Sequence, residues 1–313
     1  MPRSLSLLRV SVLLLIVQAR LSADPIPIYE LAESALPDVR DGTLADWLDL
    51  VPGPSLTTSD FRDAVWKAGE PIESGDEVRV YLGWNAALAR IYVAVERVDD
   101  VFMGGYTGSQ TLDDMSLHDS IQLMVDGDHS GGAYVMRSGT PPDREADPEA
   151  YTAYVEEVRL AEDLQAQKYQ AIAVALDQRH LRLNGSVDLR KPWATQPPYG
   201  DGLGTQDPSA PQRSLVELYV TAWDSLNYHG AEYSQPSRLR PGGVIGLQVA
   251  VIDYDQDSRD WDGFYTVNGG RPSDYEADSW LEAVLLPRDG GSTGSGIAAG
   301  GWGWIKELLR RGP

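Results

Sequence analysis

The chain has 313 residues, 47 acidic and 26 basic side chains, a formal net charge of −21 and no cysteine. Such a charge repels phosphate backbones and anionic lipid, so it excludes electrostatic binding to nucleic acid and suits neutral ligands and cations, although acidity also keeps an exported protein soluble whatever it binds. The length allows one large domain or two small ones, and a domain of this size needs no disulfide to fold.

Residues 1–23 have the pattern of a secretory signal. Arg3 and Arg9 precede the apolar run Val10–Val17, and the segment ends on the small residue Ala23. A membrane anchor is the alternative interpretation, but the run is too short to span a bilayer comfortably. We therefore expect cleavage near Ala23 and a protein that is secreted, periplasmic or held at the cell surface, with no membrane span.

Short runs that alternate apolar and polar residues dominate the rest of the chain. This period of two predicts strands over Glu77–Trp84, Ala89–Glu96, Ser120–Val125, Tyr151–Leu160, Tyr169–Leu176, Ser214–Trp223, Val244–Ile252 and Trp280–Leu286. The four residues 85–88 between the first two runs predict a hairpin turn. Many short strands separated by Gly, Pro and Asp are typical of an all-β, antiparallel β-sandwich.

Composition divides the chain into one domain and two terminal segments. We expect the domain over residues 24–287, with residues 137–213 as a long, loop-rich insertion because both ends of that stretch are rich in Pro and Gly. Residues 288–313 combine a flexible Gly/Ser linker with a short amphipathic tail. The tail fits two interpretations, docking to an envelope component or a frayed terminal helix.

Five separated segments occur in the order and spacing of one known family. They are residues 37–47 (PDVRDGTLADW), 88–102 (LARIYVAVERVDDVF), 118–128 (HDSIQLMVDGD), 241–255 (PGGVIGLQVAVIDYD) and 280–286 (WLEAVLL). Together they resemble the family 9 carbohydrate-binding modules and their DOMON-related domains. The resemblance implies a jelly-roll-like β-sandwich in an exported protein that binds sugars, commonly with structural calcium. Two departures are the duplicated acid at Asp38 and Asp41, and Gln248 where the family often has Asn.

Aspartates gather where two of the expected strands end. Hard oxygen ligands spaced two residues apart at a strand end are what calcium takes from proteins, whereas solvated turn aspartates are the alternative. The sequence therefore predicts structural calcium as a cofactor at one cluster or the other, with ligands drawn from Asp126, Asp128, Asp253, Asp255 and Asp257.

Tryptophan is abundant, with nine residues against three phenylalanines. Aromatic rings offer large flat apolar contact to sugar faces, but a loop ring also packs under its own loop. The aromatic residues expected to bind ligand are those in loops or beside the acidic loop, namely Trp66, Trp193, Trp261, Tyr199 and Tyr265. The tryptophans in or beside strand patterns are expected in the core, namely Trp47, Trp84, Trp223 and Trp280.

The sequence favours binding of a polysaccharide or oligosaccharide without catalysis, as an accessory to carbohydrate catabolism by other chains. No Gly-x-Ser-x-Gly, His-x-x-x-His or cysteine nucleophile is present. One alternative is a glycoside hydrolase whose carboxylates, Glu156 or Glu157, lie in the 137–213 stretch. Another is a haem-binding sandwich that uses a methionine such as Met124 and a nearby histidine, His118 or His129, although the alternation around Met124 also fits core packing.

Overall fold

The structure is a computed structural model that describes residues 24–107, 117–132, 134, 140–183, 191–255, 262–270 and 276–288. The expected signal, residues 1–23, and residues 289–313 of the expected tail lie outside these ranges. Within them, no helix combines the length and apolar character needed to cross a bilayer.

The described residues form strands with few helices. The strands are β1 (Ile26–Glu30), β2 (Leu56–Thr57), β3 (Phe61–Asp63), β4 (Glu77–Asn85), β5 (Arg90–Val98), β6 (Ser120–Asp126), β7 (Gln167–Ile172), β8 (Leu181–Leu183), β9 (Gly200–Gln206), β10 (Arg213–Thr221), β11 (Trp223–Ser225), β12 (Gln235–Pro236), β13 (Val244–Asp253), β14 (Gly263–Val267) and β15 (Leu281–Leu286). The helices are α1 (Trp47–Leu50), α3 (Pro148–Ala161) and the 3-10 turns η1 (Thr58–Asp60), η3 (Pro192–Thr195), η4 (Ala231–Tyr233) and η5 (Ala277–Ser279).

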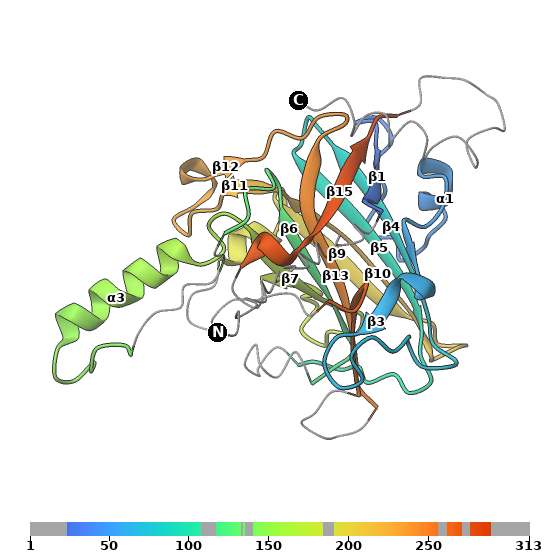
Figure 1. The fold of residues 1–313 in the computed structure, drawn as a ribbon, viewed down its shortest axis with the longest axis horizontal. Helices are drawn as coiled ribbons and strands as arrows, with labels where there is room; N and C mark the ends of the chain where they lie inside the picture. Colours follow the sequence, from blue (N-terminus) through green and yellow to red (C-terminus); the bar gives the residue numbers. More distant parts are fainter. Residues whose placement is uncertain are drawn as a thin grey trace, which may run out of the picture.

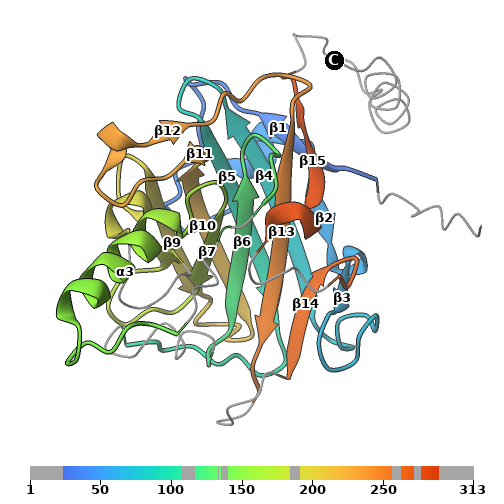
Figure 2. The ribbon, with the colours of Figure 1, turned by 60° about the vertical axis from the view of Figure 1, so that its left-hand side comes forward.

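The main sheet folds over into two facing layers. Its strand order is β8-β7-β6-β13-β15-β1-β4-β5-β10-β9, and the front and back layers are visible in Figure 2. Strand β1 runs parallel to both β15 and β4 and so connects the layers, whereas the long pairs β4–β5, β5–β10 and β6–β13 are antiparallel. The expected all-β, antiparallel sandwich is therefore confirmed, as is the hairpin between β4 and β5.

Alternation along the strands decides which side chains enter the core between the layers. In β5, Ile91, Val93 and Val95 point inward with residues of β4, β10, β6 and β13. The residues between them, Tyr92 and Ala94, lie on the outer face. That outer face is covered by residues 31–51, the segment that contains α1, which Figure 1 shows beside β4 and β5.

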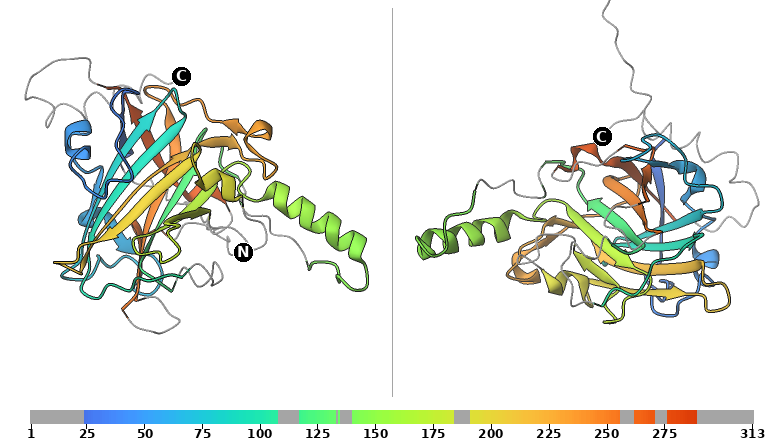
Figure 3. Two further views of the ribbon diagram at one scale, coloured as in Figure 1. Left: turned by 180° about the vertical axis from the view of Figure 1, so that it is seen from behind. Right: turned by 90° about the horizontal axis from the view of Figure 1, so that it is seen from below.

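The strand expected over Tyr151–Leu160 is wrong, because these residues form the helix α3. The Asp147 side chain accepts a hydrogen bond from the Ala150 N–H at 2.9 Å, and Pro148 occupies the first helical turn, both of which favour a helix start. Among its residues only Val158 is buried, and Figure 3 shows α3 projecting from the sandwich. The flanking stretch contributes β7, β8 and β9, which are integral strands of the two layers.

The two layers also approach each other closely at the edge opposite β1. A Cβ atom added to Gly204 of β9 would lie 2.4 Å from the Ala173 Cα and 2.5 Å from the Ile172 carbonyl oxygen. The backbone of β9 and the end of β7 therefore meet with no room for a side chain between them.

We expect Gly204→Ala to destabilise the fold by about 1–3 kcal/mol, because backbone atoms must move apart to accept the methyl group. Thermal melting against Gly270→Ala provides a matched control, since a Cβ at Gly270 meets nothing within 4 Å. Equal melting temperatures for the two variants would contradict the close approach of the layers.

Candidate functional site

One end of the sandwich is closed by charged side chains rather than by apolar ones. Continuing the inward series of β5, Arg97 takes the position after Val95 and points into the core, where it is 3% exposed. Asp119 lies two positions before Ile121, the first core residue of β6, and Asp253 lies two positions after Val251, the last core residue of β13. Since β6 and β13 are antiparallel, the start of one lies beside the end of the other, and the two carboxylates meet Arg97 from the facing layer.

Arg97 forms ion pairs with three buried carboxylates. Its Nη2 lies 2.6 Å from Asp99 and also pairs with Asp253, and its Nη1 lies 2.9 Å from Asp119. Nη1 also donates to the Ile252 carbonyl oxygen at 3.0 Å, and the Asp119 carboxylate accepts from the Tyr254 N–H at 3.0 Å. One guanidinium thus fastens β5 to the ends of β6 and β13.

The cluster holds more negative than positive charge. Burial raises the pKa of Asp99 to about 8 and that of Asp119 to about 6, although the Arg97 charge opposes both shifts. Burial also raises the pKa of Asp253 and, helped by Asp253, brings that of Asp255 to about 7. Burial therefore favours the protonated form of these carboxyl groups, whereas the Arg97 charge favours their ionised form.

The two predicted calcium clusters lie at opposite ends of the β6–β13 pair. Asp126 is opposite Gly246, whereas Asp253 is seven residues further along β13, roughly 24 Å away. A single ion cannot bridge that distance. The Asp253 carboxylate pairs with Arg97, Asp255 is half-buried beside it, and Asp257 lies outside the described residues.

The other cluster is a tight loop on the outer face of β6. Asp126 is completely buried and accepts hydrogen bonds from the Gly131 N–H at 2.8 Å and the Ser130 N–H at 3.3 Å. Asp128 is exposed and accepts from the same Ser130 N–H at 3.1 Å. Burial, together with the neighbouring Asp128 carboxyl, raises the pKa of Asp126 to about 6.

The predicted ligand-binding aromatic residues are divided between the two ends of the sandwich. Trp66 follows β3 and is 57% exposed, and Tyr265 of β14, paired with Asp63, is buried near it. Trp193 and Tyr199 are half-buried at the far end, where their rings pack against Trp223 at 5.5 and 5.6 Å between centroids. Trp261 lies outside the described residues. The structure therefore brings together Trp193 and Tyr199, whereas the Tyr265 side chain lies in the core between the layers and the Trp66 ring is exposed on its loop.

The tryptophans expected in the core are buried, each 5% exposed or less: Trp47, Trp84, Trp223 and Trp280. Met124 packs in a buried cluster with Tyr134 and Trp280, and Glu156 on α3 accepts a hydrogen bond from the Tyr228 hydroxyl at 2.5 Å. Met124 therefore has a packing role in this cluster, and Glu156 has a local hydrogen-bonding role at the surface of α3.

Two sets of charged residues in the structure were not predicted from the sequence. Arg97 carried a usable signal, because it continues the inward alternation of its strand into a run of aspartates. The second set is Asp41, Asp46 and Glu217, whose carboxylates converge on the outer face of β10. Glu217 alternates with the inward-pointing Val216 and Leu218, and nothing local in the sequence shows that residues 38–47 cover it.

We expect Arg97→Met to destabilise the fold by about 3–5 kcal/mol, because it leaves three buried carboxylates without their counter-charge. Arg79→Met is the matched control, since Arg79 makes exposed pairs with Glu77 at 2.9 Å and Glu96 at 2.8 Å that contribute at most about 1 kcal/mol. Chemical denaturation measures both variants. Similar losses would show that the buried cluster does not hold the layers together.

Comparison with known proteins gave structural matches only: no family model and no curated protein matches the chain. The chain is similar to a family 9 carbohydrate-binding module from Caldicellulosiruptor kristjanssonii solved in complex with glucose. That match has a TM-score of 0.48 and 11% sequence identity, and covers 86% of this chain and 100% of that one. It is also similar to such a module from the same organism in complex with cellotriose, with a TM-score of 0.47, 13% identity and coverage of 86% and 99%.

Proposed function

We propose that this chain is an exported, non-catalytic β-sandwich that binds carbohydrate through an exposed indole at the end of the sandwich closed by Arg97. The observation that carries the proposal is Trp66, whose side chain is 57% exposed on a loop that is held rigidly from beneath. The five sequence segments that resemble carbohydrate-binding modules support the same class of ligand.

The loop that presents Trp66 is organised around one buried carboxylate. Asp63, 1% exposed, accepts hydrogen bonds from the N–H groups of Val65 at 2.8 Å, Trp66 at 3.2 Å and Lys67 at 2.7 Å. Val65 packs against a small buried cluster that includes Phe264. These contacts fix the backbone on both sides of Trp66 without covering its ring.

An indole fixed in this way suits a sugar ring. The ring offers large apolar contact, and because its backbone is already ordered, binding costs less conformational entropy than on a mobile loop. The same loop also carries polar side chains, since the ammonium of the next residue, Lys67, lies 2.6 Å from the Glu73 carboxylate. A flat apolar surface with polar groups at its margin fits the C–H face and hydroxyl groups of a saccharide.

Structural calcium is part of the proposal. Of the aspartates expected to bind it, Asp126 and Asp128 are held in one loop, and the causes that shift the pKa of Asp126 are burial, loop N–H groups and Asp128 itself. A calcium ion there would complete the loop with oxygen ligands from protein and water. Export, proposed from residues 1–23, would bring the chain to media where calcium is abundant.

We expect Trp66→Ala to weaken retention on whichever of insoluble cellulose, xylan or chitin the unaltered chain binds. Losing about 1.5 kcal/mol of ring contact corresponds to about a tenfold loss of affinity. Tyr233→Ala is the matched control, because Tyr233 is an aromatic residue with 63% exposure on another part of the surface. Depletion isotherms with each polysaccharide measure the change.

Two outcomes would overturn the carbohydrate proposal. One is undiminished retention of the Trp66→Ala chain. The other is equal loss for Trp66→Ala and Tyr233→Ala, which would indicate non-specific adsorption through exposed rings. Unchanged thermal melting of both variants is required, so that lost binding is not lost folding.

We expect millimolar calcium to raise the melting temperature of the chelator-treated chain, and EDTA to reverse the rise. An ion that binds only the folded state stabilises it by about 1–3 kcal/mol when present well above its Kd. Asp128→Asn, on the exposed side of the 126–131 loop, should reduce the rise. Identical melts in calcium and EDTA would remove calcium from the proposal.

A further inference from the structure

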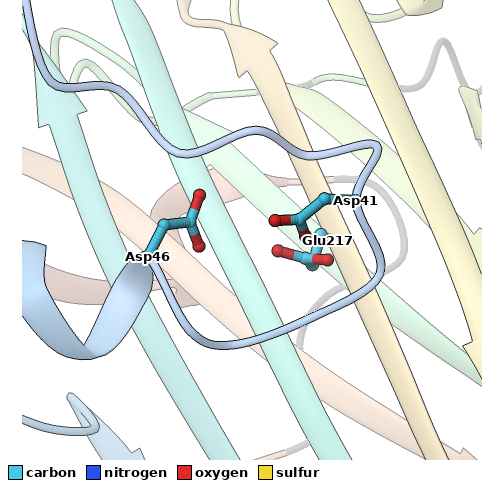
Figure 4. Close-up of side chains that lie close together, drawn as sticks. All are labelled: Asp41, Asp46 and Glu217. Atoms are coloured by element: carbon cyan, nitrogen blue, oxygen red, sulfur yellow. The ribbon is translucent and has the colours of Figure 1, made fainter.

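Three carboxylates converge on the outer face of β10, away from every residue assigned above. Figure 4 shows Asp41 and Asp46 on two sides of one loop, with Glu217 on the strand beneath it. One oxygen of each carboxylate lies within 4.8 Å of those of the other two. The loop is residues 38–47, and Glu217 is more than 170 positions further along the chain.

Glu217 is buried with one oxygen unsatisfied. Its side chain faces outward from β10, but the 38–47 loop and Trp47 cover it, so it is 0% exposed. Oε1 accepts a hydrogen bond from the Trp47 indole N–H at 2.9 Å, whereas Oε2, equally buried, accepts none. A buried carboxylate oxygen without a partner costs free energy unless something binds it.

Backbone hydrogen bonds within the 38–47 loop hold the Asp41 and Asp46 carboxylates beside Glu217. Asp41 accepts from the Thr43 N–H at 2.8 Å, and Asp46 accepts from the Asp38 N–H at 2.7 Å and the Trp47 N–H at 2.8 Å. These backbone bonds fix where both carboxyl groups lie.

No basic side chain in the described part of the chain pairs with any of the three. Arg40, the cation nearest to them in sequence, pairs with Asp201 instead. Burial, together with the charges of Asp41 and Asp46, raises the pKa of Glu217 to about 7, although the Trp47 indole and the nearby Gly42 N–H lower it. The cluster therefore lacks positive charge.

We propose that Asp41, Asp46 and Glu217 form a calcium site that fastens the 38–47 loop to β10, separate from the aspartate loops that end β6 and β13. The observation that supports a cation there is the Oε2 of the buried Glu217, which accepts no hydrogen bond and lies beside two carboxylates that the loop backbone holds in place.

Calcium fits this donor set better than other common ions. At calcium–oxygen distances of about 2.3–2.6 Å, two oxygens on one ion are at most roughly 5 Å apart, which the 4.8 Å limit of the cluster satisfies. Magnesium prefers to keep several waters and takes few protein carboxylates, and zinc prefers nitrogen and sulfur ligands. Because Asp41 is exposed, solvent has access to the cluster, and water can supply remaining ligands.

Such an ion would order more than the loop itself. Trp47, which donates to Glu217, is the centre of the apolar cluster that covers the outer face of β4, β5 and β10. Gly42, Thr43 and Leu44, between the two aspartates, line an open hollow of about 440 Å³ together with residues that include Asp207 and Arg213. Binding at the carboxylates would therefore fix part of the lining of this hollow.

The test is calcium titration of the full chain after chelator treatment, by calorimetry and by melting. Glu217→Gln removes the charge but keeps an oxygen to accept the Trp47 bond, and should abolish one calcium equivalent. Asp41→Asn, exposed and able to keep its Thr43 bond, should weaken that equivalent by at least about tenfold. Glu282→Gln, the same change at an exposed strand position on β15, should change neither.

The melts in EDTA distinguish a metal ligand from a merely structural glutamate. Without calcium, Glu217→Gln should melt at or above the temperature of the unaltered chain, because it removes a repelled, buried charge; with calcium it should melt below it. The proposal would be overturned if Glu217→Gln bound as many calcium equivalents as the unaltered chain. It would also be overturned if the difference in melting temperature between the variant and the unaltered chain were the same in calcium and in EDTA. Retention on polysaccharide and the effect of Asp128→Asn report separately on the function proposed above.

Discussion

One end of the sandwich depends on the ion pairs of Arg97, which close it. Apolar side chains fill the space between the layers along most of β5, β6 and β13. At one end of these strands the inward-pointing positions are instead occupied by Arg97, Asp99, Asp119 and Asp253. A buried guanidinium with five donors in a planar fork can satisfy several carboxylates from facing layers at once. The Trp66 loop lies at this end, so its position is set by the strands that Arg97 holds together.

Because side chains alternate between the two faces of a strand, the carboxylates of each acidic cluster meet different partners. Asp253 points inward and meets an arginine, whereas Asp126, on the outer face of β6, meets backbone N–H groups of its own loop. Glu217 also points outward, since Val216 and Leu218 enter the core on either side, but the 38–47 loop seals it among two more carboxylates. The first cluster contains its own cation, Arg97, and both oxygens of Asp126 accept backbone N–H groups. Within the described part of the chain, Glu217 has neither a paired basic side chain nor a donor for its Oε2, which is why a cation is inferred there.

Much of the fold was predictable because alternation is a local signal. The hairpin of β4 and β5 and the course of β6, β10 and β13 follow from it. Helix α3 was misread although its apolar residues Tyr151, Tyr154, Val155 and Val158 have helical spacing after an Asp-Pro start. The Arg97 cluster was within reach once β6 and β13 were taken as antiparallel neighbours. The burial of Glu217 was not, because it depends on a loop some 170 positions away that no local pattern connects to β10.

The proposed carbohydrate surface and the calcium site inferred at Glu217 lie on different parts of one scaffold. The backbone around Trp66 is fixed by the Asp63 carboxylate through three N–H groups, an arrangement that needs no ion. The cation inferred at Glu217 would hold a loop on the outer face of the opposite layer, where it compensates charge in a chain that carries −21 overall. An acidic protein without disulfides gains from such an ion because attraction to a bound divalent cation replaces repulsion between carboxylates at the place where the fold is least able to neutralise them itself.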